Sequence, residues 1–133
     1  MFVGHCLDAA ESALPYLPFT EIMAEVVGGR PDLVDAHPAL HRLLPGLHPR
    51  AAPAVEDRRL GQVQLFDAVL STLEAVSATQ PALVVVEDLH WADRSSRDLL
   101  VFLLSRLAGQ HLVLLASYRS DDLHRQHPLR PVL

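Results

Sequence analysis

Two adjacent carboxylates, Glu87 and Asp88, directly follow an uninterrupted apolar run, Leu83 to Val86. In an open parallel sheet, the carboxyl ends of the strands form the edge at which ligands bind. A pair of acids at such an edge can hold a hydrated magnesium ion and polarise a water molecule beside a nucleotide phosphate. The same pattern also arises where the acids only end a strand and cap the next turn. On the pattern alone, both interpretations stay open.

A strand–helix–strand unit surrounds these acids. Residues 82–86 and 112–116 are apolar runs typical of strands buried on both faces. Between them, Asp93 is a suitable N-cap for a helix with apolar residues from Leu99 to Leu107, and Gly109 ends it. Two apolar strands joined by a helix predict parallel pairing with a right-handed crossover, and therefore an α/β fold.

The rest of the chain adds one strand and several helical segments. We expect a strand at the start and helices in the first two thirds of the chain, over 2–6, 18–27, 38–44 and 55–78. The region 30–53 is otherwise crowded with Pro, His and Arg. The last segment, 117–133, is polar, and we expect a flexible tail with solvated histidines, His124 and His127.

The composition excludes several classes of function. The chain has 133 residues, half of them hydrophobic, with a net charge of -5, as expected for at most one globular domain. All 11 basic residues are arginine, so this polypeptide alone supplies no phosphate-binding or Schiff-base lysine. Scattered arginines in an acidic chain argue against direct nucleic-acid binding. A single cysteine, Cys6, indicates a cytoplasmic setting, and the apolar runs are too short for a membrane span.

Residues 83–93, with the sequence LVVVEDLHWAD, resemble the Walker B region of the AAA-like/STAND branch of P-loop ATPases. Such modules occur in large LuxR-type transcriptional regulators and related signalling proteins. Residues 112–120, LVLLASYRS, are similar to that family's next strand and sensor loop, while 3–6 and 13–19 resemble its second strand and following helix. The resemblance implies part of a P-loop NTPase-type parallel sheet, with three strands and helices on both faces.

For the complete domain, the resemblance implies ATP and Mg²⁺ as cofactors. Glu87 would then be the magnesium-associated acid, and Asp88 would orient the attacking water. P-loop proteins mostly carry Asp where this chain has Glu87, so the division of roles between the two acids stays open. Both acids are therefore candidate catalytic residues and candidate metal ligands.

The resemblance also implies nucleotide contacts outside the acid pair. Arg119 would be the sensor near the terminal phosphate, with Ser117 as a polar neighbour; the alternative for Arg119 is a surface ion pair with the following aspartates. His90 is either a polar contact to the cofactor or a structural residue. Trp91 is expected to anchor the loop by packing rather than to stack on a nucleobase.

The sequence departs from that family in one respect, because neither a GxxxxGK[ST] phosphate loop nor any lysine is present. We therefore expect residues 1–133 to be a partial ATPase domain that lacks the phosphate-loop strand and the C-terminal part. Such a chain should bind Mg-ATP weakly or not at all. Strand 112–116 would be an open apolar edge, so the alternative is a truncated, non-enzymatic protein that associates with itself or other chains.

Two further residue groups have ordinary explanations. His37 and His41 stand four residues apart and His48 follows, but no carboxylate or cysteine completes a zinc-site spacing. Cys6 lies in an expected strand and should be a small core residue rather than a nucleophile.

Overall fold

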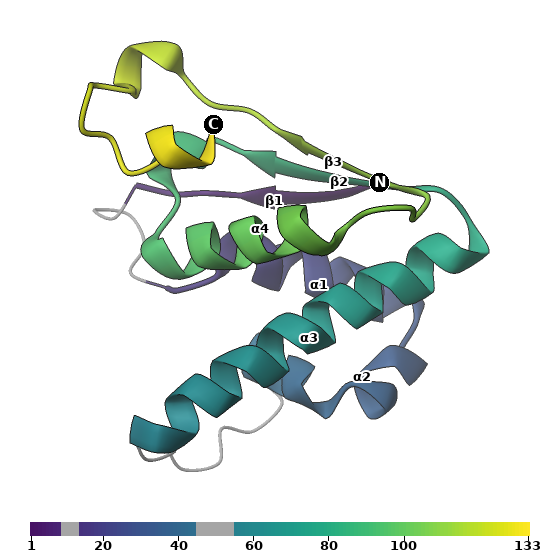
Figure 1. Ribbon diagram of the computed structural model, residues 1–133. Coiled ribbons are helices and arrows are strands. Elements are labelled where there is room, and N and C mark those ends of the chain that lie inside the picture. Colours follow the sequence, from purple (N-terminus) through teal and green to yellow (C-terminus); the bar gives the residue numbers. More distant parts are fainter. Residues whose placement is uncertain (9–13, 45–54) are drawn as a thin grey trace.

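Three parallel strands form one sheet in the order β1-β2-β3 in the computed structural model, which describes residues 1–8, 14–44 and 55–133 (Figure 1). The strands are β1 (Phe2–His5), β2 (Ala82–Glu87) and β3 (Leu112–Ala116). Val84 of the central strand pairs with Phe2 on one side and Leu114 on the other. The predicted α/β class, with three parallel strands, is confirmed.

The connections between the strands are helical. The α-helices are α1 (Leu17–Gly29), α2 (Asp32–Ala36), α3 (Val55–Thr79) and α4 (Arg94–Arg106), and the 3-10 helices are η1 (Pro38–Arg42), η2 (Leu89–Trp91), η3 (Ser120–Asp122) and η4 (Arg130–Val132). The predictions for α1, α3, α4 and the short piece at 38–44 are confirmed. Helix α2 was not predicted, because five residues are too few for a helical period to be recognised. Residues 45–54 lie outside the described part of the chain.

All four α-helices lie on one side of the sheet (Figure 1). The strand order advances in one direction, β1-β2-β3, and each crossover is expected to be right-handed, so successive connections fall on the same face. Our expectation of helices on both faces is therefore wrong for the described residues. The other face carries alternate strand residues, and two of them are largely exposed: Val113 at 61% and Leu115 at 55%.

The covered face of the sheet forms the core. Val84 and Val86 of β2 are buried there with Cys6. Helix α1 lies so close to β1 that a Cβ at Gly4 would stand 2.2 Å from the carbonyl oxygen of Pro18. Because only this face is covered, the prediction that residues 82–86 and 112–116 are buried on both faces is wrong. Strand β3 alternates between half-buried and exposed residues.

The C-terminal segment is folded onto the core rather than free. Leu123 and Leu129 are buried, and the Leu129 N–H donates to Nδ1 of half-buried His127 at 3.1 Å. The expectation of a flexible tail is therefore wrong for these residues, because two leucines anchor the segment, although His124 is exposed as expected. No helix in the described ranges is long and apolar enough to cross a bilayer.

Candidate functional site

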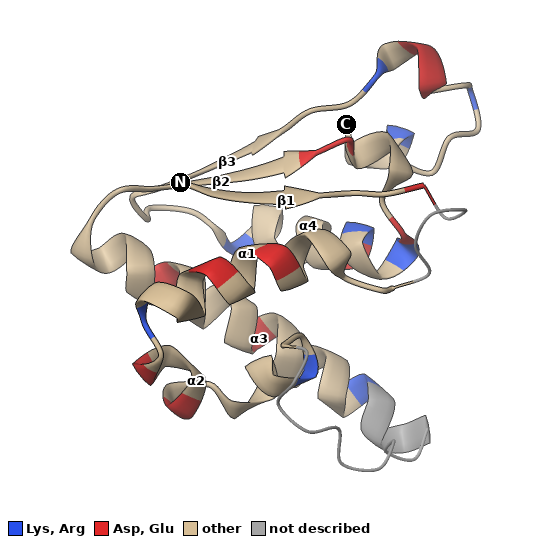
Figure 2. Cartoon of the chain, turned by 180° about the vertical axis from the view of Figure 1, so that it is seen from behind, with Lys and Arg blue, Asp and Glu red and all other residues tan. Residues whose placement is uncertain are grey.

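The acid pair stands where β2 leaves the sheet. Glu87 is the last residue of β2, and Asp88 adopts the left-handed conformation at φ 56° and ψ 43° before the chain enters η2. Figure 2 shows the acidic end of β2 at the carboxyl edge of the sheet. A left-handed conformation costs energy in any residue with a Cβ, and such strain clusters at functional sites. Asp88 therefore turns the backbone sharply at the edge where ligands bind in parallel sheets.

Ser117 joins the loop after β3 to the turn that carries Asp88. The Ser117 N–H donates to the Val86 carbonyl at 3.0 Å and continues the β2–β3 ladder. Its side-chain oxygen accepts from the Asp88 N–H at 3.2 Å, and its carbonyl oxygen accepts from the Leu89 N–H at 2.8 Å. Three backbone groups around Asp88 are thus satisfied by one residue, which holds the two loops side by side.

His90 makes a second connection between the same loops. Its Nδ1 accepts the backbone N–H of Arg119 at 3.2 Å, and its ring packs 4.8 Å from the ring of Trp91. The His90 side chain is 0% exposed, so it contacts no ligand in this arrangement. Its burial favours the structural alternative for His90. Trp91 is 37% exposed and packs on His90, which agrees with its expected anchoring role.

Arg119 itself is exposed at this edge of the sheet. Among the described residues, no ion pair links its guanidinium to Asp121 or Asp122. Asp122 instead places a carboxylate oxygen 3.3 Å from Nε2 of His90. The backbone of Arg119 is therefore held in place while its side chain stays accessible to a ligand.

His5, which sequence analysis did not identify as a site residue, contacts Glu87 directly. Its Nε2 lies 3.1 Å from a Glu87 carboxylate oxygen, and its Nδ1 lies 3.1 Å from a carboxylate oxygen of Glu21 on α1. The same Glu21 oxygen accepts the His5 N–H at 2.7 Å. The available signal was the position of His5 at the end of a predicted strand, but only the β1–β2 register pairs it with Glu87.

Asp93 and Cys6 lie beneath the same turn. Asp93 caps α4: its carboxylate accepts the Ser96 N–H at 3.1 Å and the Ser96 hydroxyl. Burial, together with the nearby negative charges of Asp93 and Asp88, raises the pKa of the Cys6 thiol to about 12. A buried thiol that keeps its proton is a poor nucleophile, so the core role predicted for Cys6 is confirmed.

The oxygen ligands at this edge fit a magnesium ion. Mg²⁺ commonly takes one or two protein carboxylates and completes its shell with waters and phosphate oxygens. Glu87 and Asp88 supply such carboxylates, and the Glu87 side chain is 47% exposed. Within the described ranges, no group of three or more His, Cys, Asp or Glu residues could hold a metal by itself. A magnesium ion here would thus depend on phosphate oxygens for its remaining ligands.

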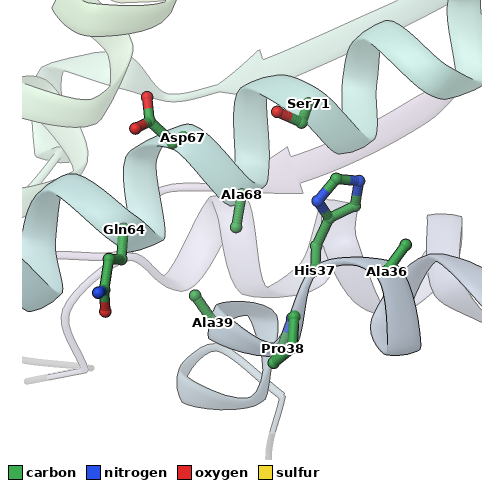
Figure 3. Close-up of a pocket in the computed structure, with 8 residues that line it drawn as sticks. All are labelled: Ala36, His37, Pro38, Ala39, Gln64, Asp67, Ala68 and Ser71. Carbon is green, nitrogen blue, oxygen red and sulfur yellow. The ribbon is translucent and has the colours of Figure 1, made fainter.

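The hollows beside η1 and beside the turn after β2, both among the described residues, do not include the acid pair. A cavity of about 130 Å³ adjoins the turn after β2 and is lined by Cys6, Leu7, Leu14, Leu17, Pro18, Trp91, Ala92 and Asp93. A shallower one of about 390 Å³ lies between η1 and α3, where the His37 ring points toward α3 (Figure 3). His37 has no metal-binding cluster around it among the described residues, and His48 lies outside them.

Comparison with known proteins identifies the family of this chain. An uncharacterized protein of Rhizobium meliloti (strain 1021) is 40% identical over 83 residues, which are 59% of this chain and 8% of that relative. The chain thus spans a small part of the relative's length. No solved structure was found to match. The family described as "AAA ATPase domain" matches residues 1–115. Since that match covers most of the described sheet and helices, the chain belongs to the AAA ATPase domain family.

Proposed function

We propose that this chain is the part of an ATP-binding and ATP-hydrolysing regulatory module that carries the Walker B acids and the sensor loop. The proposal is supported by one observation above all: Ser117 binds the backbone of Asp88 and Leu89, so that the acid pair and the Arg119 loop lie at the same carboxyl edge. Membership of the AAA ATPase domain family supports nucleotide as the ligand.

The proposed roles divide between the two acids. Glu87 is the candidate magnesium-associated acid, and Asp88 is the candidate that orients the attacking water. Mg²⁺ would neutralise charge between the carboxylates and the phosphates, which otherwise repel each other. The exposed Arg119 is the candidate sensor of the terminal phosphate, with Ser117 beside it. LuxR-type transcriptional regulators and related signalling proteins are the proposed context of the module.

The phosphate-binding elements have to come from outside these 133 residues, because the sequence has no lysine and no GxxxxGK[ST] motif. Backbone N–H groups of such a loop, together with its lysine, supply most of the attraction for a triphosphate. We therefore propose that nucleotide binds once a phosphate-loop strand stands beside β3, whose outer edge is open among the described residues.

Calorimetry tests this proposal. The 133-residue chain should show no micromolar binding of Mg-ATP, whereas a polypeptide with a phosphate-loop strand and helix in front of Met1 should bind and slowly hydrolyse it. In that longer protein, Asp88→Asn should reduce turnover far more than ATP affinity. Glu87→Gln should weaken the magnesium dependence of binding. Asp98→Asn, on the exposed face of α4, is the matched control and should change neither.

The results that contradict the proposal are equally specific. Micromolar Mg-ATP binding by the 133-residue chain would show that the groups that bind the triphosphate lie within these residues. Unchanged turnover in Asp88→Asn would move the water-orienting role elsewhere, with Glu87 as the first candidate. If both acids could be replaced without effect, the acid pair would have no part in hydrolysis.

A second candidate is a non-enzymatic protein that associates with itself or other chains through the open edge of the sheet at β3. The exposure of Val113 and Leu115 on β3 favours this candidate, since apolar edge strands without charge recruit other chains. The two candidates differ in one measurement. A chain that associates and never binds nucleotide, even with a phosphate loop added, would support the second.

A further inference from the structure

We infer that His90 is a positioning residue, which holds the loop of Arg119 in fixed register with the turn of Asp88. The relevance of this coupling to phosphate sensing rests on the proposed function. The coupling itself is a property of the described chain and stands on hydrogen bonds and burial alone.

The hydrogen bond from Arg119 determines which nitrogen of the His90 ring carries the proton. A backbone N–H can only donate, and the Arg119 N–H lies 3.2 Å from Nδ1 of His90. Nδ1 therefore carries no proton, and the neutral ring carries its proton on Nε2. That N–H faces the Asp122 carboxylate at 3.3 Å, close enough for attraction but not aligned for a hydrogen bond. The ring is thus oriented by both of its nitrogens.

The burial of His90 makes its hydrogen bond with the Arg119 N–H costly to break. Because the His90 side chain is 0% exposed, water has no access to replace the Arg119 N–H at Nδ1. A buried acceptor that loses its partner costs more than the bond itself contributes. The two loops are therefore expected to move together: Ser117 binds the turn from one side, and His90 reaches back from η2 to Arg119.

This arrangement has a consequence for the exposed arginine. The Arg119 backbone is fixed relative to Asp88 through His90, so only the side chain of Arg119 remains to reorient when a ligand arrives. His90 therefore couples the turn of Asp88 to Arg119, in addition to the link that Ser117 makes between the same two loops. His90 thus acts on the nucleotide through Arg119 and does not touch it.

Hydrogen exchange of single backbone amides tests the inference in the 133-residue chain without nucleotide. In His90→Gln, the amide group lies nearer the place of Nε2, so the acceptor for Arg119 is lost. In His90→Asn, the side-chain oxygen lies close to the place of Nδ1 and can accept. The Arg119 amide should exchange about tenfold faster in His90→Gln and within about twofold of the parent in His90→Asn.

The core amides of β2 separate this role from a general loss of stability. In His90→Gln, the amides of Val84 and Val86 should accelerate less than the Arg119 amide, and the exposed His111→Gln should leave the Arg119 amide unchanged. Equal acceleration of Arg119 and the β2 core would overturn the inference, because His90 would then only stabilise the fold. Equal rates at Arg119 in the Asn and Gln variants would also overturn it. Neither result bears on nucleotide binding, so the proposed function is tested separately.

Discussion

The left-handed backbone of Asp88 makes a quantitative prediction about stability. A left-handed conformation costs about 1–2 kcal/mol in a residue with a Cβ. Glycine avoids this cost but loses about 0.5–1 kcal/mol through the greater freedom of its unfolded chain. Asp88→Gly should therefore be more stable than Asp88→Ala by about 0.5–1 kcal/mol. Asp88→Asn should be at least as stable as the parent, because asparagine tolerates this conformation and removes a charge beside Glu87.

Urea unfolding measures these differences. With a denaturant slope of about 2 kcal/mol/M, the Gly and Ala variants should differ in midpoint by about 0.4 M. An alanine variant as stable as the glycine variant would refute the left-handed turn at Asp88. If Asp88→Asn is as stable as the parent but lowers turnover in the protein that carries a phosphate loop, Asp88 behaves as a functional residue and not as a stabilising one.

Three further predictions concern the elements around the site. Asp93→Ala removes the N-cap of α4, which accepts the Ser96 N–H, and should lower the free energy of unfolding by about 1 kcal/mol. Asp98→Ala, at an exposed position of the same helix, should change it by less than about 0.5 kcal/mol. Gly4→Ala places a Cβ against the Pro18 carbonyl and should lower the free energy of unfolding by about 2 kcal/mol. Gly28→Ala, with open space around it, should raise it by about 0.5 kcal/mol. Urea unfolding measures these changes and those of the two aspartate variants. Because the pKa of Cys6 is raised to about 12, iodoacetamide at pH 8 should label the native thiol at least about 100-fold more slowly than the urea-unfolded thiol. The same shift makes the Cys6 contribution to stability complete below pH 9.0 and lost as the pH rises toward 12, so equal labelling rates or a flat stability profile would contradict it.

Local patterns in the sequence predicted most elements correctly. The apolar runs at 82–86 and 112–116, and the apolar period of α3, produced strands and a helix where the structure has them. The alternation of more buried and more exposed side chains along β2 and β3 was not predictable in this way. A run such as LVLLA has the same composition whether one face or both are covered, and coverage depends on the order of strands. With a strand order that advances in one direction, right-handed crossovers leave one face without helices.

The candidate site was predictable as far as single residues carry a signal. Glu87 and Asp88 follow a strand run, and the family resemblance predicted that Ser117 and Arg119, which follow the next strand, belong to the same site. The contact of His5 with Glu87 depends on the register between β1 and β2, which are about 80 residues apart in the chain. The burial of His90 likewise depends on how the 117–122 loop folds over it, and a polar sequence gave no sign of that.

The uncovered face of the sheet leads to a final prediction, about association. Val113 and Leu115 are largely exposed, and β3 carries no charged residue to oppose pairing with another chain. The 133-residue chain should therefore elute from a size-exclusion column ahead of a compact monomer, increasingly so at higher concentration. Leu115→Lys puts a charge on the exposed face and should shift elution to the monomer with little loss of stability. Leu114→Lys is the matched control, because the Leu114 side chain points to the helix-covered face. This substitution should lower the free energy of unfolding by about 2 kcal/mol or more. A parent chain that elutes as a monomer, or a Leu115→Lys variant that associates as strongly as its parent, would show that β3 is not the associating surface.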